Sequence, residues 1–236
     1  EVARVGMRLG QVIQQDSLVS GLVGISIGSA CIRSLAAHLD QLSVRDCDLL
    51  RDVCLEWLTF PDPLPRVLHA ERKVVLSSLA EFRKLPGEAA IDPAQLDATS
   101  KAASELFDRL IAETRKRPWE RQGVDAQEAS DLARALLTPI AQSMSASLNA
   151  YTREEANVRQ LALHALILRY RWHHDRLPTT LEELNPGELH IDPFTGKPLI
   201  YETQGRGYRL YSAGPLAQAN DPQAVNGRRP VSVVPE

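Results

Sequence analysis

The chain has 236 residues, of which 44% are hydrophobic, 24% charged and 5% aromatic, and its formal net charge is -3. This is the composition of a folded globular protein with room for one large domain or two ordinary ones. The small negative charge excludes a general electrostatic attraction to nucleic acid or to anionic lipid, so we expect no nucleic-acid partner.

The N-terminal part predicts two helices. Residues 2–15 carry apolar side chains at Val5, Leu9, Val12 and Ile13, a helical spacing. The uncharged stretch 17–32 is shorter than the roughly 20 residues of a membrane-spanning helix, and it predicts a buried core helix that continues to about residue 42.

The stretch GISIG, at residues 24–28, has the spacing of a hydrolase nucleophile elbow centred on Ser26. Such an elbow needs a preceding strand and a sharp turn, whereas this one lies in a helical pattern without β–α alternation. We interpret it as chance. The three cysteines, Cys31, Cys47 and Cys54, have no zinc-site spacing and are interpreted as buried thiols.

Proline and glycine separate the helices that follow. Ser43 marks a helix start, Pro139 predicts a kink or a break, and Thr152 with Glu155 predicts a capping box that opens a long apolar helix. The predicted helices before Thr152 cover residues 43–58, 67–85, 92–117, 125–137 and 140–151. These segments predict a mainly α fold with a helical region over residues 1–150.

Residues 151–215 predict a small α+β module. The long helix ends before Pro178, a short helix follows at residues 181–184, and residues 192–198 form a loop. Two strands, at residues 199–203 and 208–212, are expected to pair across a four-residue hairpin loop. Residues 216–236, rich in proline, are expected to be a loosely ordered tail.

This module resembles the globular part of the major pseudopilins of type II secretion, in which a spine helix leads into a Pro-Thr-Thr turn, an Asp-Pro-aromatic-x-Gly-x-Pro loop and a hairpin ending in Ser-x-Gly. The matching positions are Tyr170, Arg176, Pro178, Thr179, Leu181, Leu184, Asp192, Pro193, Phe194, Gly196, Pro198, Tyr201, Tyr208, Ser212 and Gly214. They cover about a quarter of the chain.

The resemblance implies an extracytoplasmic, periplasmic address and a protein partner or self-association. Because no Met precedes Glu1, we expect a trimmed chain whose membrane contact comes only from an anchor upstream. The family's closing loop binds calcium, but here Asn220 and Asp221 are its only calcium candidates, too few for the six to eight oxygens that calcium prefers. We expect no other cofactor.

No catalytic group is predicted. His173, His174 and Asp175 point in different directions on a helix, and His164 is interpreted as a hydrogen-bonded core histidine. Glu182 and Glu183 are interpreted as solvated residues at a helix start.

The leading hypothesis is therefore a non-catalytic structural or interaction protein. The first alternative is a helical module that binds a peptide or a small ligand in a groove of the N-terminal helices. The second is an unrecognised hydrolase that uses Ser26 or a His/Asp site.

Overall fold

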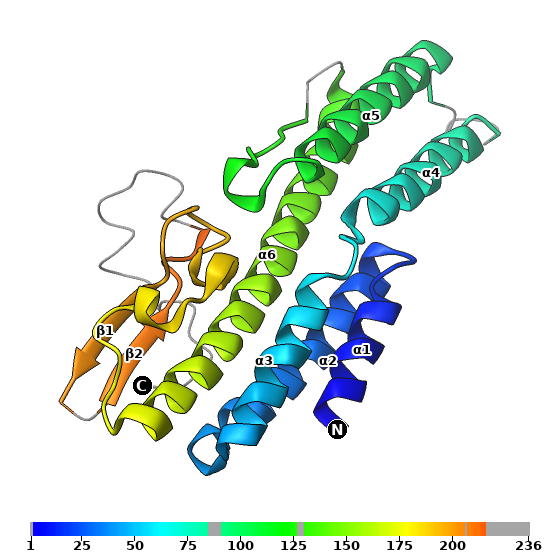
Figure 1. Cartoon of the computed structure of the whole chain (residues 1–236). Coiled ribbons are helices and arrows are strands. Elements are labelled where there is room, and N and C mark those ends of the chain that lie inside the picture. The colour runs from blue at the N-terminus through cyan, green and yellow to red at the C-terminus, as the bar shows by residue number, and fades with distance from the viewer. Residues whose placement is uncertain (1, 85–90, 127–129, 206, 216–236) are drawn as a thin grey trace. The chain divides into compact units, whose positions relative to one another are not determined.

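The computed structural model describes residues 2–84, 91–126, 130–205 and 207–215. The chain is 72% helical and has six α-helices and one two-stranded antiparallel sheet within these ranges, which confirms the predicted mainly α fold. The elements are α1 (Val2–Ile13), α2 (Leu18–Ala36), α3 (Val44–Leu58), α4 (Leu64–Phe82), α5 (Pro93–Thr114), α6 (Asp131–His174), β1 (Ile200–Gln204) and β2 (Gly207–Tyr211) (Figure 1).

The chain divides into two compact units, one made of residues 1–12, 23–61 and 151–236, the other of residues 13–22 and 62–150. One dividing point, at Tyr151, lies where the module was expected to begin. Most of residues 1–61, by contrast, group with the module and not with the remaining helices. Residues from both predicted regions therefore build the first unit together.

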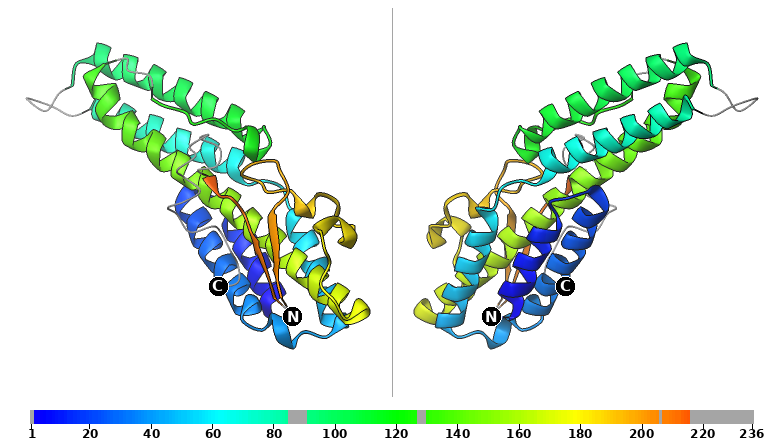
Figure 2. Two further views of the ribbon diagram at one scale, coloured as in Figure 1. Left: turned by 90° about the vertical axis from the view of Figure 1, so that its left-hand side faces the viewer. Right: turned by 90° about the vertical axis from the view of Figure 1, so that its right-hand side faces the viewer.

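The second unit is helical. Leu68 of α4 and Leu106, Phe107 and Leu110 of α5 are buried, as is Leu137 in the first part of α6. Figure 2 shows α4 and α5 running side by side in both views. Arg121, beyond α5, forms an ion pair with Asp62 just before α4, at 3.1 Å.

α6 is one continuous helix of 44 residues, so of the kink or break predicted at Pro139 the break does not occur, and the predicted start at Thr152 is wrong. Pro139 is exposed, as is Ala135 one turn before it, and water can therefore solvate the carbonyl that loses its amide partner. Thr152 is 5% exposed and lies inside the helix, not at its start. By contrast, the start predicted at Ser43 is confirmed by a capping box with Asp46.

In the first unit the C-terminal half of α6 lies between two layers. Figure 1 shows α1, α2 and α3 on one side of this half and the hairpin on the other. The apolar residues of α6 from Val158 to Ile167 join the same core as Met7, Ile32, Cys54 and Leu210. This enclosure explains why the apolar positions of the helix cover more than one face.

The hairpin has a shorter turn than expected. Tyr201 pairs with Leu210, and Gln204 pairs directly with Gly207, so Gln204 and Gly207 belong to the strands and not to the expected four-residue loop. Gly205 has a φ of 59°, the left-handed conformation that such a tight turn requires.

α2 differs from the buried core helix that its composition predicts. It ends at Ala36, and only one side of it is buried, at Gly21, Gly24, Gly28, Ile32 and Ala36. Glycine has no side chain to hold a neighbour at a distance, and this side therefore allows other helices to come very close.

Two contacts of α2 in the first unit show this close approach. A Cβ added at Gly10 of α1 would lie 2.8 Å from the carbonyl oxygen of Gly24, and one added at Gly28 would lie 2.2 Å from Oε1 of Glu154 on α6. α1 and α6 thus each approach α2 through a glycine. The Gly10 contact turns this side of α1 towards α2.

We expect Gly10→Ala to destabilise the protein by about 1–3 kcal/mol, although alanine is the better helix former by about 1 kcal/mol. The added methyl group meets a backbone carbonyl, which moves only if the whole helix moves. Urea unfolding measures the loss, and Gly123→Ala is the matched control because nothing lies within 4 Å of its added Cβ. Equal stability of the two variants would contradict the close approach.

Candidate functional site

The buried carboxylate of Asp192 joins the loop after α6 to the end of the hairpin. Its Oδ1 accepts hydrogen bonds from the Phe194 amide at 2.9 Å and from Ser212 Oγ at 2.9 Å. Its Oδ2 accepts one from the Ala213 amide at 3.0 Å. Asp192 is 1% exposed and Ser212 is 0% exposed. This carboxylate therefore connects two segments inside the protein and is not accessible to a substrate.

Other motif residues shape the same loop. The carbonyl of Asp192 accepts the Gly196 amide at 2.8 Å, and Gly196 has a φ of 69°. Gly214, with a φ of 76°, donates its amide to Ser212 Oγ at 3.0 Å. Both glycines stand where a side chain would be strained. Phe194 is buried at 1% exposure, and Pro198 bridges to Ile191.

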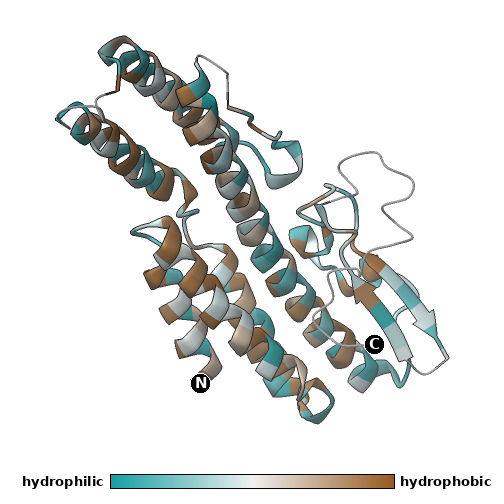
Figure 3. Ribbon diagram, turned by 180° about the vertical axis from the view of Figure 1, so that it is seen from behind, coloured by the Kyte–Doolittle hydropathy of each residue, from teal (hydrophilic) through white to brown (hydrophobic). Residues whose placement is uncertain are grey.

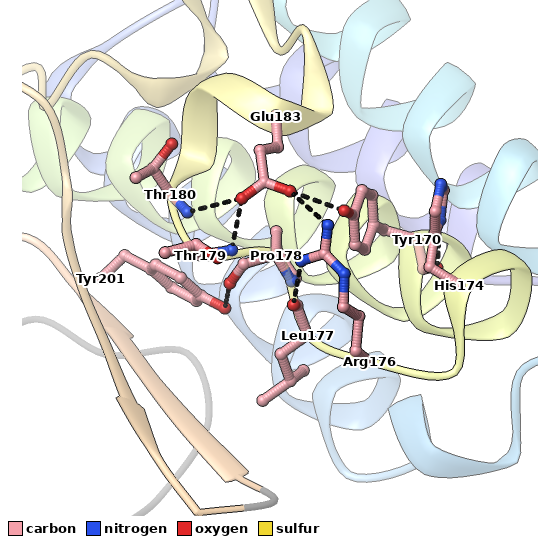
Figure 4. Close-up of polar contacts among 9 residues, drawn as sticks. All are labelled: Tyr170, His174, Arg176, Leu177, Pro178, Thr179, Thr180, Glu183 and Tyr201. Atoms are coloured by element: carbon pink, nitrogen blue, oxygen red, sulfur yellow. Dashed lines mark hydrogen bonds and ion pairs between the residues drawn. The ribbon is translucent and has the colours of Figure 1, made fainter.

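A second cluster forms around Glu183, at the end of α6 (Figure 4). Glu183 Oε2 accepts hydrogen bonds from Tyr170 Oη at 2.6 Å and from Arg176 at 3.1 Å, and Oε1 accepts one from the Thr179 amide at 2.7 Å. Tyr201 Oη of β1 donates to the carbonyl of Pro178 at 2.9 Å. We expected Glu183 to be only a solvated residue at a helix start. Its carboxylate also stabilises the turn by accepting these hydrogen bonds.

These hydrogen bonds change the acidity of the cluster. The Tyr170 hydroxyl and then the Thr179 amide lower the pKa of Glu183 to about 2. The same contact raises the pKa of Tyr170, since losing the phenol proton would place two negative oxygens together. The carboxylate therefore keeps its charge, and its contribution to the turn is present above the ordinary pKa and is lost only as the pH falls towards 2.

The tyrosines of the hairpin meet α6 in the core. Tyr208 Oη lies 2.7 Å from Nδ1 of His164, and the rings of Tyr201 and Tyr208 lie 5.8 Å apart. Burial lowers the pKa of His164 to about 4 and raises the pKa of Tyr201 to about 12. His164 is 3% exposed and stays neutral at ordinary pH, as expected for a core histidine.

The residues considered for catalysis are not assembled. Ser26 lies in the middle of α2, without the strand-to-helix turn of a nucleophile elbow. His174 stacks on Tyr170 with ring centroids 4.0 Å apart, and Nδ1 of His190 is 2.6 Å from the Gly187 carbonyl. Within the described ranges no group of three or more His, Cys, Asp or Glu residues is arranged to hold a metal ion. The calcium candidates Asn220 and Asp221 lie outside the described residues.

The apolar pattern of α1 does not indicate which of its sides faces the core. Its buried residues are Met7, Gly10 and Gln11, and Gln11 donates to the Trp57 carbonyl at 2.9 Å. Arg4 and Arg8 form ion pairs with Glu56 of α3 at 2.8 and 2.9 Å. The exposed residues of α1 are Val2, Val5, Arg8, Leu9 and Val12. We call these five the α1 seam. Figure 3 shows hydrophobic residues recurring along the helices beside the N label.

α2 alone among the described helices is long and apolar enough to cross a membrane; it has 19 residues, and 22% of its apolar window is buried. The core helix of a soluble protein, which is mostly buried, and a signal sequence can have the same length and hydropathy.

Comparisons of the chain with models of protein families, with curated proteins and with solved structures found no match.

Proposed function

We propose that this chain is a non-catalytic structural or interaction protein of the extracytoplasmic compartment, with a pseudopilin-like C-terminal module. The observation that carries the proposal is the use of the module's polar residues. Asp192 and Glu183, the two acids that join its turns, each hold three or more groups of the module itself. Carboxylates used in this way position backbone and side chains of the module, and these two are not free to exchange protons with a substrate.

The exposed surfaces favour binding over chemistry. Val5 and Leu9 of the α1 seam are 61% and 50% exposed, and Trp172 near the end of α6 is 63% exposed. Several exposed apolar side chains along one helix face indicate an interaction surface more often than a single exposed apolar side chain does. Assembly with another protein through such a face is what the resemblance implies.

The test is the location and the assembled size of the protein in its own cells. Fractionation is expected to place the full natural protein in the cell envelope, and chemical crosslinking followed by gel analysis is expected to trap it in species heavier than one chain. A natural protein found only in the cytosol and only as a monomer would overturn the proposal. So would turnover of any substrate that disappears in Ser26→Ala or His174→Ala.

A further inference from the structure

We propose that the α1 seam is a docking site for one amphipathic helix of another protein, with acidic residues flanking its apolar positions. This inference rests on the proposed function, because it names the partner of an interaction protein. The seam is the outward side of a helix whose other sides are already occupied by α2 and α3.

The spacing of the seam fits a single helix. Val2, Val5, Leu9 and Val12 are separated by three, four and three residues, as are the first and fourth positions of two successive heptads. Side chains at these positions form a narrow stripe into which one partner helix inserts its own side chains. A helix lying on lipid has a broader apolar face. Because α2 also exposes an apolar side chain, Val23, at 47%, binding to lipid is one of the outcomes that the experiment below tests.

The charge of the seam indicates which charged residues the partner helix carries beside its apolar positions. Arg8 is the single charged residue on the described exposed side of α1, and its side chain is 64% exposed although one nitrogen pairs with Glu56. Arg4 shares the same glutamate, so two cations face one anion and a positive charge remains beside the seam. A partner helix with Glu or Asp beside its apolar positions complements this charge.

A second copy of this chain fits less well. Two seams packed antiparallel place Arg8 near the Arg8 of the other copy, with no acid on the described exposed side of α1 to offset the repulsion.

The experiment uses two synthetic peptides of three heptads with leucine at the first and fourth positions. One carries Glu at both flanking positions and the other carries Lys; repulsion keeps each peptide from pairing with itself. Fluorescence anisotropy is expected to give about tenfold tighter binding of the Glu peptide. Leu9→Asp is expected to weaken that binding about tenfold, and Arg8→Glu to reverse the preference.

Val74→Asp is the matched control, because Val74 is an equally exposed apolar residue, at 58%, on α4. It is expected to bind the Glu peptide as the unmodified chain does, and circular dichroism verifies the fold of each variant. Equal binding of the two peptides, or no binding, overturns the inference. So does a dimer in sedimentation, or binding to phosphatidylcholine–phosphatidylglycerol vesicles, that Leu9→Asp abolishes.

The failure of this inference is distinguishable from failure of the proposed function. If the natural protein with Leu9→Asp stays in crosslinked envelope assemblies, the α1 seam is not the docking site but the proposed function stands. If the unmodified protein is a cytosolic monomer, the proposed function fails whatever the peptides do.

Discussion

Asp192→Ala is expected to lower the free energy of unfolding by about 3–5 kcal/mol. The substitution removes the acceptor of two amides and one hydroxyl, those of Phe194, Ala213 and Ser212. Because Asp192 is 1% exposed, water reaches these donors only if the loop opens, and each buried donor without a partner costs about 1–3 kcal/mol. Urea unfolding followed by circular dichroism measures the effect.

Two further variants divide this effect. Asp192→Asn keeps the shape and one acceptor but turns an amide donor towards the Ala213 amide or Ser212, so a loss of about 2 kcal/mol is expected. Ser212→Ala removes one hydroxyl and is expected to cost about 1 kcal/mol.

Asp40→Ala is the control because Asp40 is an exposed carboxylate, and we expect a change within about 0.5 kcal/mol. A loss below about 1 kcal/mol for Asp192→Ala would show that the loop does not depend on the carboxylate.

The elements of this fold were predictable from local patterns, and so was the end of the long helix before Pro178, but the start of that helix was not. A proline and a Thr-x-x-Glu sequence are ordinary signals for a helix break and a helix start. Here Pro139 faces solvent and Thr152 is buried, and packing along α6 outweighs both signals. Burial of a single position is a property of the tertiary structure, and no periodicity in the chain encodes it.

The candidate site was also predictable only in part. The Asp-Pro-Phe-Thr-Gly-Lys-Pro loop indicates a turn, and Asp192 does build one. The hydrogen bond that Tyr170 donates to Glu183 joins residues 13 apart through a reversal of the chain, which no local rule anticipates.

The α1 seam is a third case, because periodicity states which residues share a face and not whether that face lies inside. Gly10, Arg4 and their contacts with α2 and α3 decide the orientation.

His164→Gln is expected to make the stability of the protein less dependent on pH. Burial lowers the pKa of the folded-state imidazole to about 4, whereas an unfolded histidine has a pKa of 6.5. Between these pH values His164 binds a proton in the unfolded chain but not in the folded chain. The free energy of unfolding therefore falls as the pH falls from 6.5 towards 4. This difference in pKa corresponds to roughly 3 kcal/mol, of which about 2 kcal/mol is lost between pH 7 and pH 4.5.

The measurement compares urea unfolding of the unmodified chain and the variant at pH 7, 6, 5 and 4.5, so that the titration of the carboxylates is common to both. At pH 7 the variant is expected to be about 1–2 kcal/mol less stable, because the packing against Tyr208 changes. Near pH 4.5 the gap is expected to close, since glutamine has no proton to take up.

His174→Gln is the control because this imidazole is exposed on the last turn of α6. A gap between the unmodified chain and His164→Gln that stays constant over the whole range would mean that His164 is hydrated in solution. Tyr208 would then not exclude water from His164, and the core between the hairpin and α6 would be accessible to solvent at this point. A closing gap, in contrast, ties the pH sensitivity of the chain to the contact that attaches the hairpin.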